Sequence, residues 1–176
     1  MPKIKPQVLW MTGFSGAGKS TLAYALEKKL QLEGILCEVL DGDVLRNGIN
    51  AGLGFSEADR NENIRRTAEL AKLLLHNNFI VICSLITPTN NLRAVARNVL
   101  GNEMKLVHIS TPLEVCKNRD VKGLYGKAIK GEIKEFTGIS APFDIPDKAD
   151  FEIDTQNLSE SQCVEGLYAF LRNTSL

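Results

Sequence analysis

The chain has 176 residues, the length of one ordinary domain with its own hydrophobic core. Its 21 basic and 21 acidic residues balance, so net charge gives no indication of binding to nucleic acid or a membrane surface. No apolar run approaches the ~20 residues that a membrane-spanning helix needs. We therefore expect a single domain over residues 1–176, with neither nucleic acid nor membrane among its partners.

The N-terminal residues do not resemble a secretory signal peptide, because a glycine-rich motif follows within a few residues. The four cysteines, Cys37, Cys83, Cys116 and Cys163, are scattered and form no C-x-x-C pair. This pattern is typical of buried thiols in a reducing compartment rather than of a zinc site. We expect a cytoplasmic protein.

The first predicted element is a buried strand over residues 7–12, and a helix with apolar residues at helical spacing is predicted over residues 22–32. Between them the chain reads G-x-x-x-x-G-K-S, the phosphate-binding loop of P-loop proteins, rather than an ordinary glycine-rich turn. Lys19 is expected to reach the β- and γ-phosphates of ATP, and the Ser20 hydroxyl to bind Mg²⁺. The residues expected to bind the nucleotide are Gly13, Phe14, Ser15, Gly16, Ala17, Gly18, Lys19, Ser20 and Thr21.

Four more apolar, strand-like runs follow, and helical patterns separate them. They cover residues 35–40, 79–86, 104–110 and 150–153. This alternation predicts an α/β fold: a mostly parallel sheet of about five strands with helices on both faces, the three-layer sandwich of P-loop NTPases. In such folds ligands bind at the carboxyl ends of the strands.

Two carboxylates, Asp41 and Asp43, stand at the end of the second predicted strand and are expected to face this ligand crevice. One of them can orient or deprotonate an acceptor hydroxyl, and the other can hold Mg²⁺ through water. Asp43 as a cap for a helix beginning near Val44 is the alternative. The third predicted strand carries no acidic residue over 79–84, which places the expected metal-binding role on Asp41.

A further polar group follows in residues 45–66. Arg46, Arg60 and Asn63 can clamp an anionic acceptor, because guanidinium groups suit bidentate contact with phosphate or sulfate oxygens. Phe55 can stack on a base. A solvated helix with Glu–Arg pairs along its surface is the alternative interpretation.

Three helix starts are marked by capping residues. Ser56 with Asp59 predicts a helix that runs to about Leu75. Thr111 is expected to cap a helix with Pro112 at its first position. Ser159 with Gln162 has the pattern of a capping box for the last helix.

From about residue 117 to 135 the chain is rich in lysine, arginine and glycine. This segment follows the fourth strand and helix, where P-loop kinases carry a mobile lid. A basic lid can neutralise transferring phosphate and exclude water. A solvated basic loop is the alternative.

Several of these motifs resemble the adenylylsulfate kinase (APS kinase) family over nearly the full length. The matching stretches are GFSGAGKS, DGD-x-x-R, GLGFS, DRNENIRR, TPLEVC, RDVKGLY and FTGI. The resemblance implies phosphorylation of the 3′-hydroxyl of adenosine 5′-phosphosulfate with MgATP. It also implies a homodimer.

The resemblance also assigns roles to single residues. Asp43 matches the residue that activates the 3′-hydroxyl, and Lys19 and Arg119 match groups at the ATP phosphates. The substrate-binding positions implied are Arg46, Phe55, Arg60, Asn63, Ile86, Thr87, Lys122, Leu124 and Phe143.

The chain departs from the family after the third strand, where Ile-Ser-Pro, an aromatic and an arginine are usual. Residues 86–90 here read Ile-Thr-Pro-Thr-Asn, and we do not interpret Thr87 as a nucleophile, because direct transfer needs none. The departure keeps open a related kinase for another nucleotide-linked anion, such as cytidine diphosphoramidate in capsule synthesis. A non-catalytic GTP-binding module is a third hypothesis; the chain lacks the Asn-Lys-x-Asp stretch that reads guanine.

Overall fold

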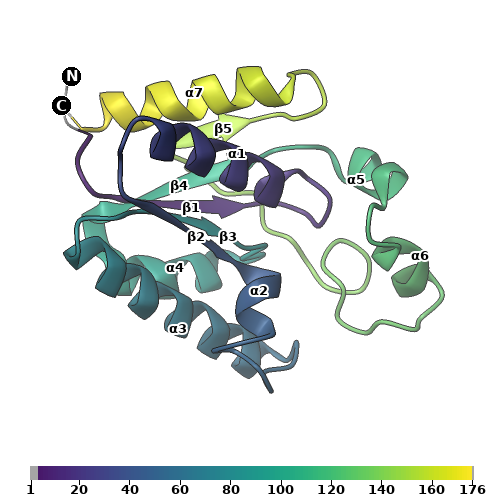
Figure 1. Cartoon of the computed structure of the whole chain (residues 1–176). Coiled ribbons are helices and arrows are strands. Elements are labelled where there is room, and N and C mark those ends of the chain that lie inside the picture. The colour runs from purple at the N-terminus through teal and green to yellow at the C-terminus, as the bar shows by residue number, and fades with distance from the viewer. Residues whose placement is uncertain (1–3, 176) are drawn as a thin grey trace.

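The computed structural model describes residues 4–175, so residues 1–3 and 176 of the predicted domain lie outside the described part. Five parallel strands form one sheet in the order β2-β3-β1-β4-β5, which confirms the predicted parallel sheet (Figure 1). The strands are β1 (Val8–Thr12), β2 (Cys37–Asp41), β3 (Ile80–Ser84), β4 (Met104–Ile109) and β5 (Phe151–Ile153). All five begin and end within two residues of the predicted runs.

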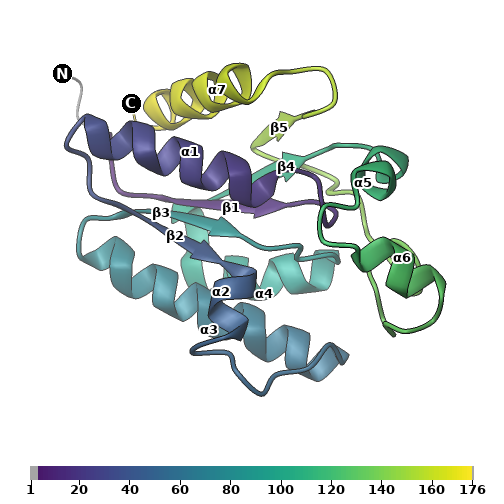
Figure 2. The same cartoon turned by 45° about the vertical axis from the view of Figure 1, so that its right-hand side comes forward.

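Helices cover both faces of the sheet, so the three-layer sandwich is confirmed. Helices α1 (Lys19–Leu32) and α7 (Glu160–Asn173) lie on one face, and α3 (Glu57–His76) and α4 (Asn90–Leu100) lie on the other (Figures 1 and 2). A short 3-10 helix, Gly101–Glu103, joins α4 to β4.

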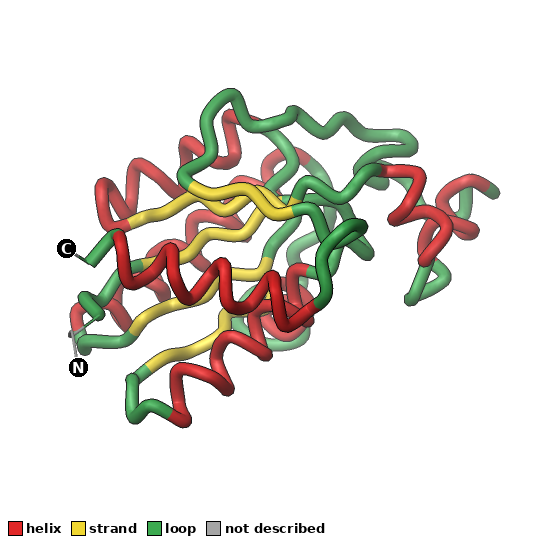
Figure 3. The backbone as a smooth tube through the Cα atoms, turned by 90° about the horizontal axis from the view of Figure 1, so that it is seen from above, coloured by secondary structure: helices red, strands yellow, loops and turns green. Residues whose placement is uncertain are grey.

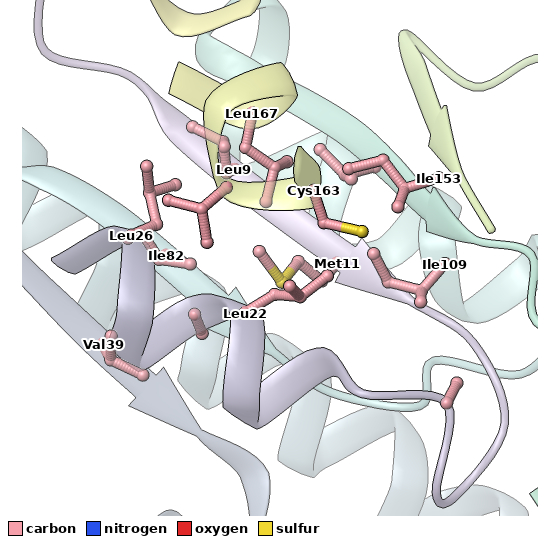
Figure 4. Packing of buried hydrophobic residues seen from close by; sticks show 14 of the residues in the cluster. Leu9, Met11, Leu22, Leu26, Val39, Ile82, Ile109, Ile153, Cys163 and Leu167 are labelled. Carbon is pink, nitrogen blue, oxygen red and sulfur yellow. The ribbon is translucent and has the colours of Figure 1, made fainter. Parts of the chain in front are cut away.

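Strand β1 supplies side chains to the cores on both sides because successive residues point to opposite faces. Leu9 and Met11 pack with Leu22, Leu26 and Leu167 under α1 and α7, as Figure 4 shows. Val8 and Trp10 face the second core, under α3 and α4. With every residue of β1 fully buried, the loop that follows it begins from a rigid base.

Three short helices lie beyond the carboxyl ends of the strands. Helix α2 (Gly42–Arg46) follows β2, while α5 (Leu113–Arg119) and α6 (Leu124–Ile129) project to one side of the molecule (Figures 1 and 3). The predicted lid, 117–135, therefore contains the last turn of α5 and all of α6, a helix that the sequence had not indicated.

Two of the three predicted helix caps are confirmed. Ser56 accepts a hydrogen bond from the backbone N–H of Asp59, and Ser159 forms a complete capping box with Gln162. The third was wrong: α5 begins at Leu113, and its cap position is Pro112, which has no capping side chain. The Thr111 hydroxyl lies instead against the hydroxyl of Thr155, at 2.7 Å.

Within residues 4–175, no helix combines the length and apolar character needed to cross a membrane.

Candidate active site

The loop between β1 and α1 depends on glycines at two places. Gly13 follows β1 so closely that a Cβ on it would lie 2.6 Å from the carbonyl oxygen of Ile109. Gly18 adopts a left-handed conformation, φ 101°, at the N-cap of α1, where a side chain would add strain. The loop therefore presents its backbone N–H groups at the start of a 14-residue helix, an arrangement that binds anions.

Lys19 is buried inside this loop and its ammonium group donates to two loop carbonyls. The distances from Nζ are 3.0 Å to Gly13 O and 2.7 Å to Phe14 O. Burial lowers the pKa of Lys19 from 10.5 to about 8. A polyphosphate in the loop offers this ammonium group an anionic partner in place of neutral carbonyls.

Asp41 connects the loop to the end of β2. Its Oδ2 accepts a 2.6 Å hydrogen bond from Ser20 Oγ, which also lies 3.1 Å from Ser84 Oγ at the end of β3. Its Oδ1 accepts from the N–H groups of Asp43 and Val44 and so caps α2. The alternative of Asp43 as the cap was wrong, because α2 begins at Gly42 and its cap position is Asp41.

The Asp43 side chain is free of capping and lies at the surface of the pocket. Its Oδ2 forms an ion pair with Nζ of Lys122 from the lid. Both side chains are more than half exposed. The lid is therefore tied across the pocket to the carboxylate predicted to activate the acceptor.

A cavity of about 490 Å³ lies between the phosphate loop, α2, α3, the end of β3 and the lid. The predicted site residues that line it are Ser15, Gly16, Gly18, Lys19, Ser20, Thr21, Asp41, Asp43, Arg46, Phe55, Arg60, Asn63, Ile86, Thr87, Lys122 and Leu124. The predicted residues outside its lining are Gly13, Phe14, Ala17, Arg119 and Phe143. The sequence prediction thus gathers most of its residues around one space.

The Phe55 ring lies against two guanidinium groups. Arg46 and Arg60 approach its ring, at 4.4 and 5.5 Å from the ring centroid. Arg46 also donates to the carbonyls of Leu53 and Gly54, and Arg60 to those of Phe55 and Glu135. Burial lowers the pKa of both arginines, yet both stay charged at neutral pH. The Glu–Arg pairs of the solvated-helix alternative are present, between Glu62 and both Arg65 and Arg66. Arg60 takes no part in them and lines the cavity instead.

Thr87 is buried and held in a strained conformation. Its φ is +40°, which is uncommon for a β-branched residue. Trp10 Nε1 donates to its Oγ1 at 3.0 Å, and Thr12 Oγ1 donates to the carbonyls of Ile86 and Thr87. This bonding supports the expectation that Thr87 is no nucleophile.

Asn63 is also buried, and its Oδ1 accepts from Asn50. The contact fixes one end of its amide at the wall of the cavity formed by α3.

Two predicted residues make contacts beside the cavity. Arg119 donates to the hydroxyl and the carbonyl of Thr155, and at 3.4 Å to the loop carbonyl of Gly16. Phe143 packs on Phe14 of the loop, with ring centroids 4.4 Å apart. Arg119 thus contacts the phosphate loop through Gly16, and Phe143 contacts it through Phe14.

One wall of the cavity is formed by Ile133, Lys134, Glu135, Phe136 and Thr137. None of them was predicted as a site residue, although the predicted lid extends to residue 135. The matching FTGI stretch was the signal that could have indicated this wall. Sequence reasoning also missed Ser84, the polar residue that ends an otherwise apolar strand, and Tyr125, whose hydroxyl donates to the loop carbonyl of Ser15.

Comparison with known proteins places this geometry among nucleotide kinases. The adenylylsulphate kinase family model matches residues 5–154. An adenylyl-sulfate kinase of Bacteroides thetaiotaomicron is 54% identical over 161 residues, covering 91% of this chain and 80% of the relative. An adenylyl-sulfate kinase of Clostridium acetobutylicum is 48% identical over 172 residues, covering 98% and 86%.

A solved structure is similarly close. The Mycobacterium tuberculosis APS kinase CysC, solved in complex with AMPPNP and APS, superimposes with a TM-score of 0.92 at 42% identity. The superposition covers 96% of this chain and 99% of that one.

Proposed function

The chain belongs to the adenylylsulfate kinase family, and from this premise we propose how its pocket performs the reaction. The enzyme transfers the γ-phosphoryl group of ATP to the 3′-hydroxyl of adenosine 5′-phosphosulfate (APS), and the product is 3′-phosphoadenosine 5′-phosphosulfate. This is a step of sulfate assimilation. The observation that carries the assignment of the pocket is that the phosphate loop, Asp43 and the Arg46–Phe55–Arg60 group line one cavity.

The ATP half of the site is the loop with Lys19 and Arg119. Phosphoryl transfer depends mainly on positioning and charge neutralisation. The loop N–H groups and the start of α1 hold the phosphates, and Lys19 turns from Gly13 O and Phe14 O toward them. Arg119, fixed by Thr155, supplies positive charge from the lid side. The AMPPNP of the tuberculosis relative, an ATP analogue, supports this half.

The acceptor half begins at Asp43. We propose that its carboxylate accepts the proton of the 3′-hydroxyl. Asp43 does not cap α2, and it lines the cavity together with the phosphate loop. Lys122 pairs with the carboxylate before substrate enters and is placed to neutralise phosphate when the lid closes. The APS-binding group is formed by Arg46 and Arg60, which lie on the Phe55 ring, together with the other lining residues Asn63, Ile86, Thr87 and Leu124.

Mg²⁺ fits Ser20 and Asp41, whose oxygens lie 2.6 Å apart at the end of the loop. Among residues 4–175 no cluster of three or more His, Cys, Asp or Glu side chains forms a complete metal cage. Mg²⁺ in nucleotide kinases keeps several waters and takes few protein oxygens beside substrate phosphates. When bound, the ion neutralises charge on the β- and γ-phosphates.

The homodimer and the cytoplasmic location remain predictions, the first from the family resemblance and the second from composition. Sedimentation of the purified protein at several concentrations tests the dimer: a protomer mass at every concentration contradicts it.

A coupled assay of ADP release tests the function. With ATP present, addition of APS is expected to raise ADP release well above the ATP-only rate. A cytidine-containing acceptor, cytidine diphosphoramidate, is the matched comparison for the alternative kinase. Release that stays at background with APS contradicts the assignment of the acceptor, and faster turnover of the cytidine compound favours the alternative.

A further inference from the structure

Residues 133–137 form a wall of the cavity, which we call the 133–137 wall, and its middle residues are held from two sides. On the acceptor side, Arg60 Nη2 donates to Glu135 O at 2.7 Å. On the loop side, the Phe136 ring meets Tyr125 edge to face, with centroids 5.0 Å apart. Tyr125 in turn donates to Ser15 O. The wall therefore spans the space between the acceptor group and the ATP loop.

The backbone after the wall turns tightly and sets the position of Thr137. The N–H groups of Ile139, Ser140 and Ala141 all point to Phe136 O, and Gly138 N–H donates to Ala141 O at 2.8 Å. Thr137 also forms a β-bridge with Ala141. Because these backbone hydrogen bonds close the turn, they hold the Cα of Thr137 in place at the cavity.

Thr137 is 3% exposed, and its Oγ1 has no hydrogen-bond partner among residues 4–175. The other buried polar side chains at the cavity differ. Ser84 Oγ lies 3.1 Å from Ser20 Oγ, Thr87 Oγ1 accepts from Trp10, and Asn63 Oδ1 accepts from Asn50. A buried hydroxyl without a partner destabilises the folded state, so its presence calls for a physical explanation.

We propose that the Thr137 hydroxyl is a specificity-determining contact that hydrogen-bonds a polar edge atom of the acceptor's nucleobase. This proposal rests on the proposed function, since it deepens the description of the same pocket. It commits to the base rather than to the phosphosulfate because of the neighbours: Thr137 follows Phe136 in a wall that Arg60 links to Phe55. Aromatic surfaces suit a planar base, whereas the anionic group is matched by the arginines and Lys122.

The proposal predicts effects of opposite sign on stability and on substrate binding. Thr137→Val keeps the shape of the side chain and removes the hydroxyl. Its melting temperature without ligand is expected to equal that of the wild type or to exceed it by roughly 2–4 °C, because no hydrogen bond is lost. The KM for APS is expected to rise about 3- to 10-fold, with the KM for ATP and kcat little changed.

Two further variants make the comparison specific. Thr137→Ser restores the hydroxyl and is expected to return the KM for APS to within about twofold of the wild type. Thr67→Val is the stability control: the Thr67 hydroxyl is buried and donates to Asn63 O at 2.8 Å, so its removal is expected to lower the melting temperature. A series of APS analogues, each with one polar atom of the base replaced by C–H, identifies the contacted atom. The analogue that lacks this atom is expected to bind the wild type more weakly than APS does, but to bind Thr137→Val as well as APS does.

Three results overturn the proposal. The first is a KM for APS of Thr137→Val within twofold of the wild type. The second is a fall in melting temperature like that of Thr67→Val, or a failure to fold, since an unpaired hydroxyl is not needed for folding. The third is a serine variant that does not restore binding. A wild type that does not turn over APS contradicts the proposed function. A wild type and a Thr137→Val variant that both turn over APS with equal kinetics contradict only the role of Thr137.

Discussion

Lys122 of the lid holds its ammonium group against Oδ2 of Asp43, the residue that follows Gly42 in the first turn of α2. The two residues are 79 positions apart in the sequence. Both residues line the cavity, so their ion pair joins the predicted lid to helix α2. Each side chain stays more than half exposed, so each is free to exchange its partner for a substrate group.

Asp43→Ala is expected to lower kcat by about 10²- to 10⁴-fold, because it removes the carboxylate that we propose accepts the hydroxyl proton. ATP affinity, measured by calorimetry, is expected to stay unchanged, since the phosphate loop does not depend on Asp43. Glu69→Ala, an exposed carboxylate on α3 outside the cavity lining, is the control and keeps full activity. Loss of ATP binding together with activity would mean that Asp43 has a structural role.

Lys122→Ala is expected to reduce kcat/KM for APS while changing the free energy of unfolding by only about 0–1 kcal/mol, the range of exposed ion pairs. Steady-state kinetics and urea unfolding measure the two effects. Lys127→Ala is the matched control, because Lys127 lies in α6 of the same lid but does not line the cavity. Equal losses in both variants would assign the effect to the overall charge of the lid instead.

Lys19 gives the protein a specific pH dependence of stability. Burial lowers its pKa to about 8, whereas the unfolded chain keeps the ordinary 10.5. Between these values the unfolded state holds a proton that the folded state has lost, so the free energy of unfolding rises with pH. Below about pH 8 both states are protonated and the contribution is flat.

Lys19→Met removes this dependence. The difference in unfolding free energy, wild type minus variant, is expected to increase from pH 8 to pH 10 by about 2 kcal/mol. Urea unfolding of both proteins across this range measures it, with Lys28→Met, an exposed lysine of the same helix, as the control. A difference that stays constant with pH would contradict the lowered pKa.

Asp41 combines a cap with the proposed metal contact, and two substitutions separate these roles. Asn caps helices about as well as Asp, so Asp41→Asn is expected to keep most of the stability but to raise the Mg²⁺ concentration needed for activity. Asp41→Ala additionally loses about 0.5–2 kcal/mol of stability. Activity titrated with Mg²⁺ after EDTA treatment provides the measurement, and identical Mg²⁺ curves for Asp41→Asn and the wild type would remove Asp41 from the metal site.

Thr87→Val is expected to leave the buried Trp10 N–H without its partner and to destabilise the protein by about 1–3 kcal/mol. The chain has one tryptophan, so its emission reports this site alone. Thr87→Ser keeps the hydroxyl and is expected to retain the emission maximum of the wild type. An unchanged emission spectrum and unchanged stability in the valine variant would contradict the hydrogen bond.

The strands and the phosphate loop were predictable because their signals are local. An apolar run between turn residues indicates a buried strand, and a G-K-S triplet at the start of a helix has few alternatives. The choice between Asp41 and Asp43 as cap was not predictable, since the two lie two residues apart and helix ends are the least certain part of any such pattern.

The 133–137 wall could not be placed from residue types alone. It is fixed by Arg60 donating to a backbone carbonyl 75 residues away, and a backbone carbonyl has no signature in the sequence. The same holds for Thr111, whose hydroxyl found Thr155 and the Ala17 carbonyl instead of its own helix. Contacts between distant loops depend on the whole fold, and only the folded chain specifies them.

The four cysteines are all buried and form no disulfide, and burial raises the pKa of each thiol, that of Cys37 to about 11. Since the thiolate is the reactive form, the native enzyme offers electrophiles and oxidants very little to attack. The rate at which each thiol reacts therefore reports how often its own element, β2, β3, α5 or α7, opens to solvent. The order in which they become labelled would record the sequence in which the molecule comes apart.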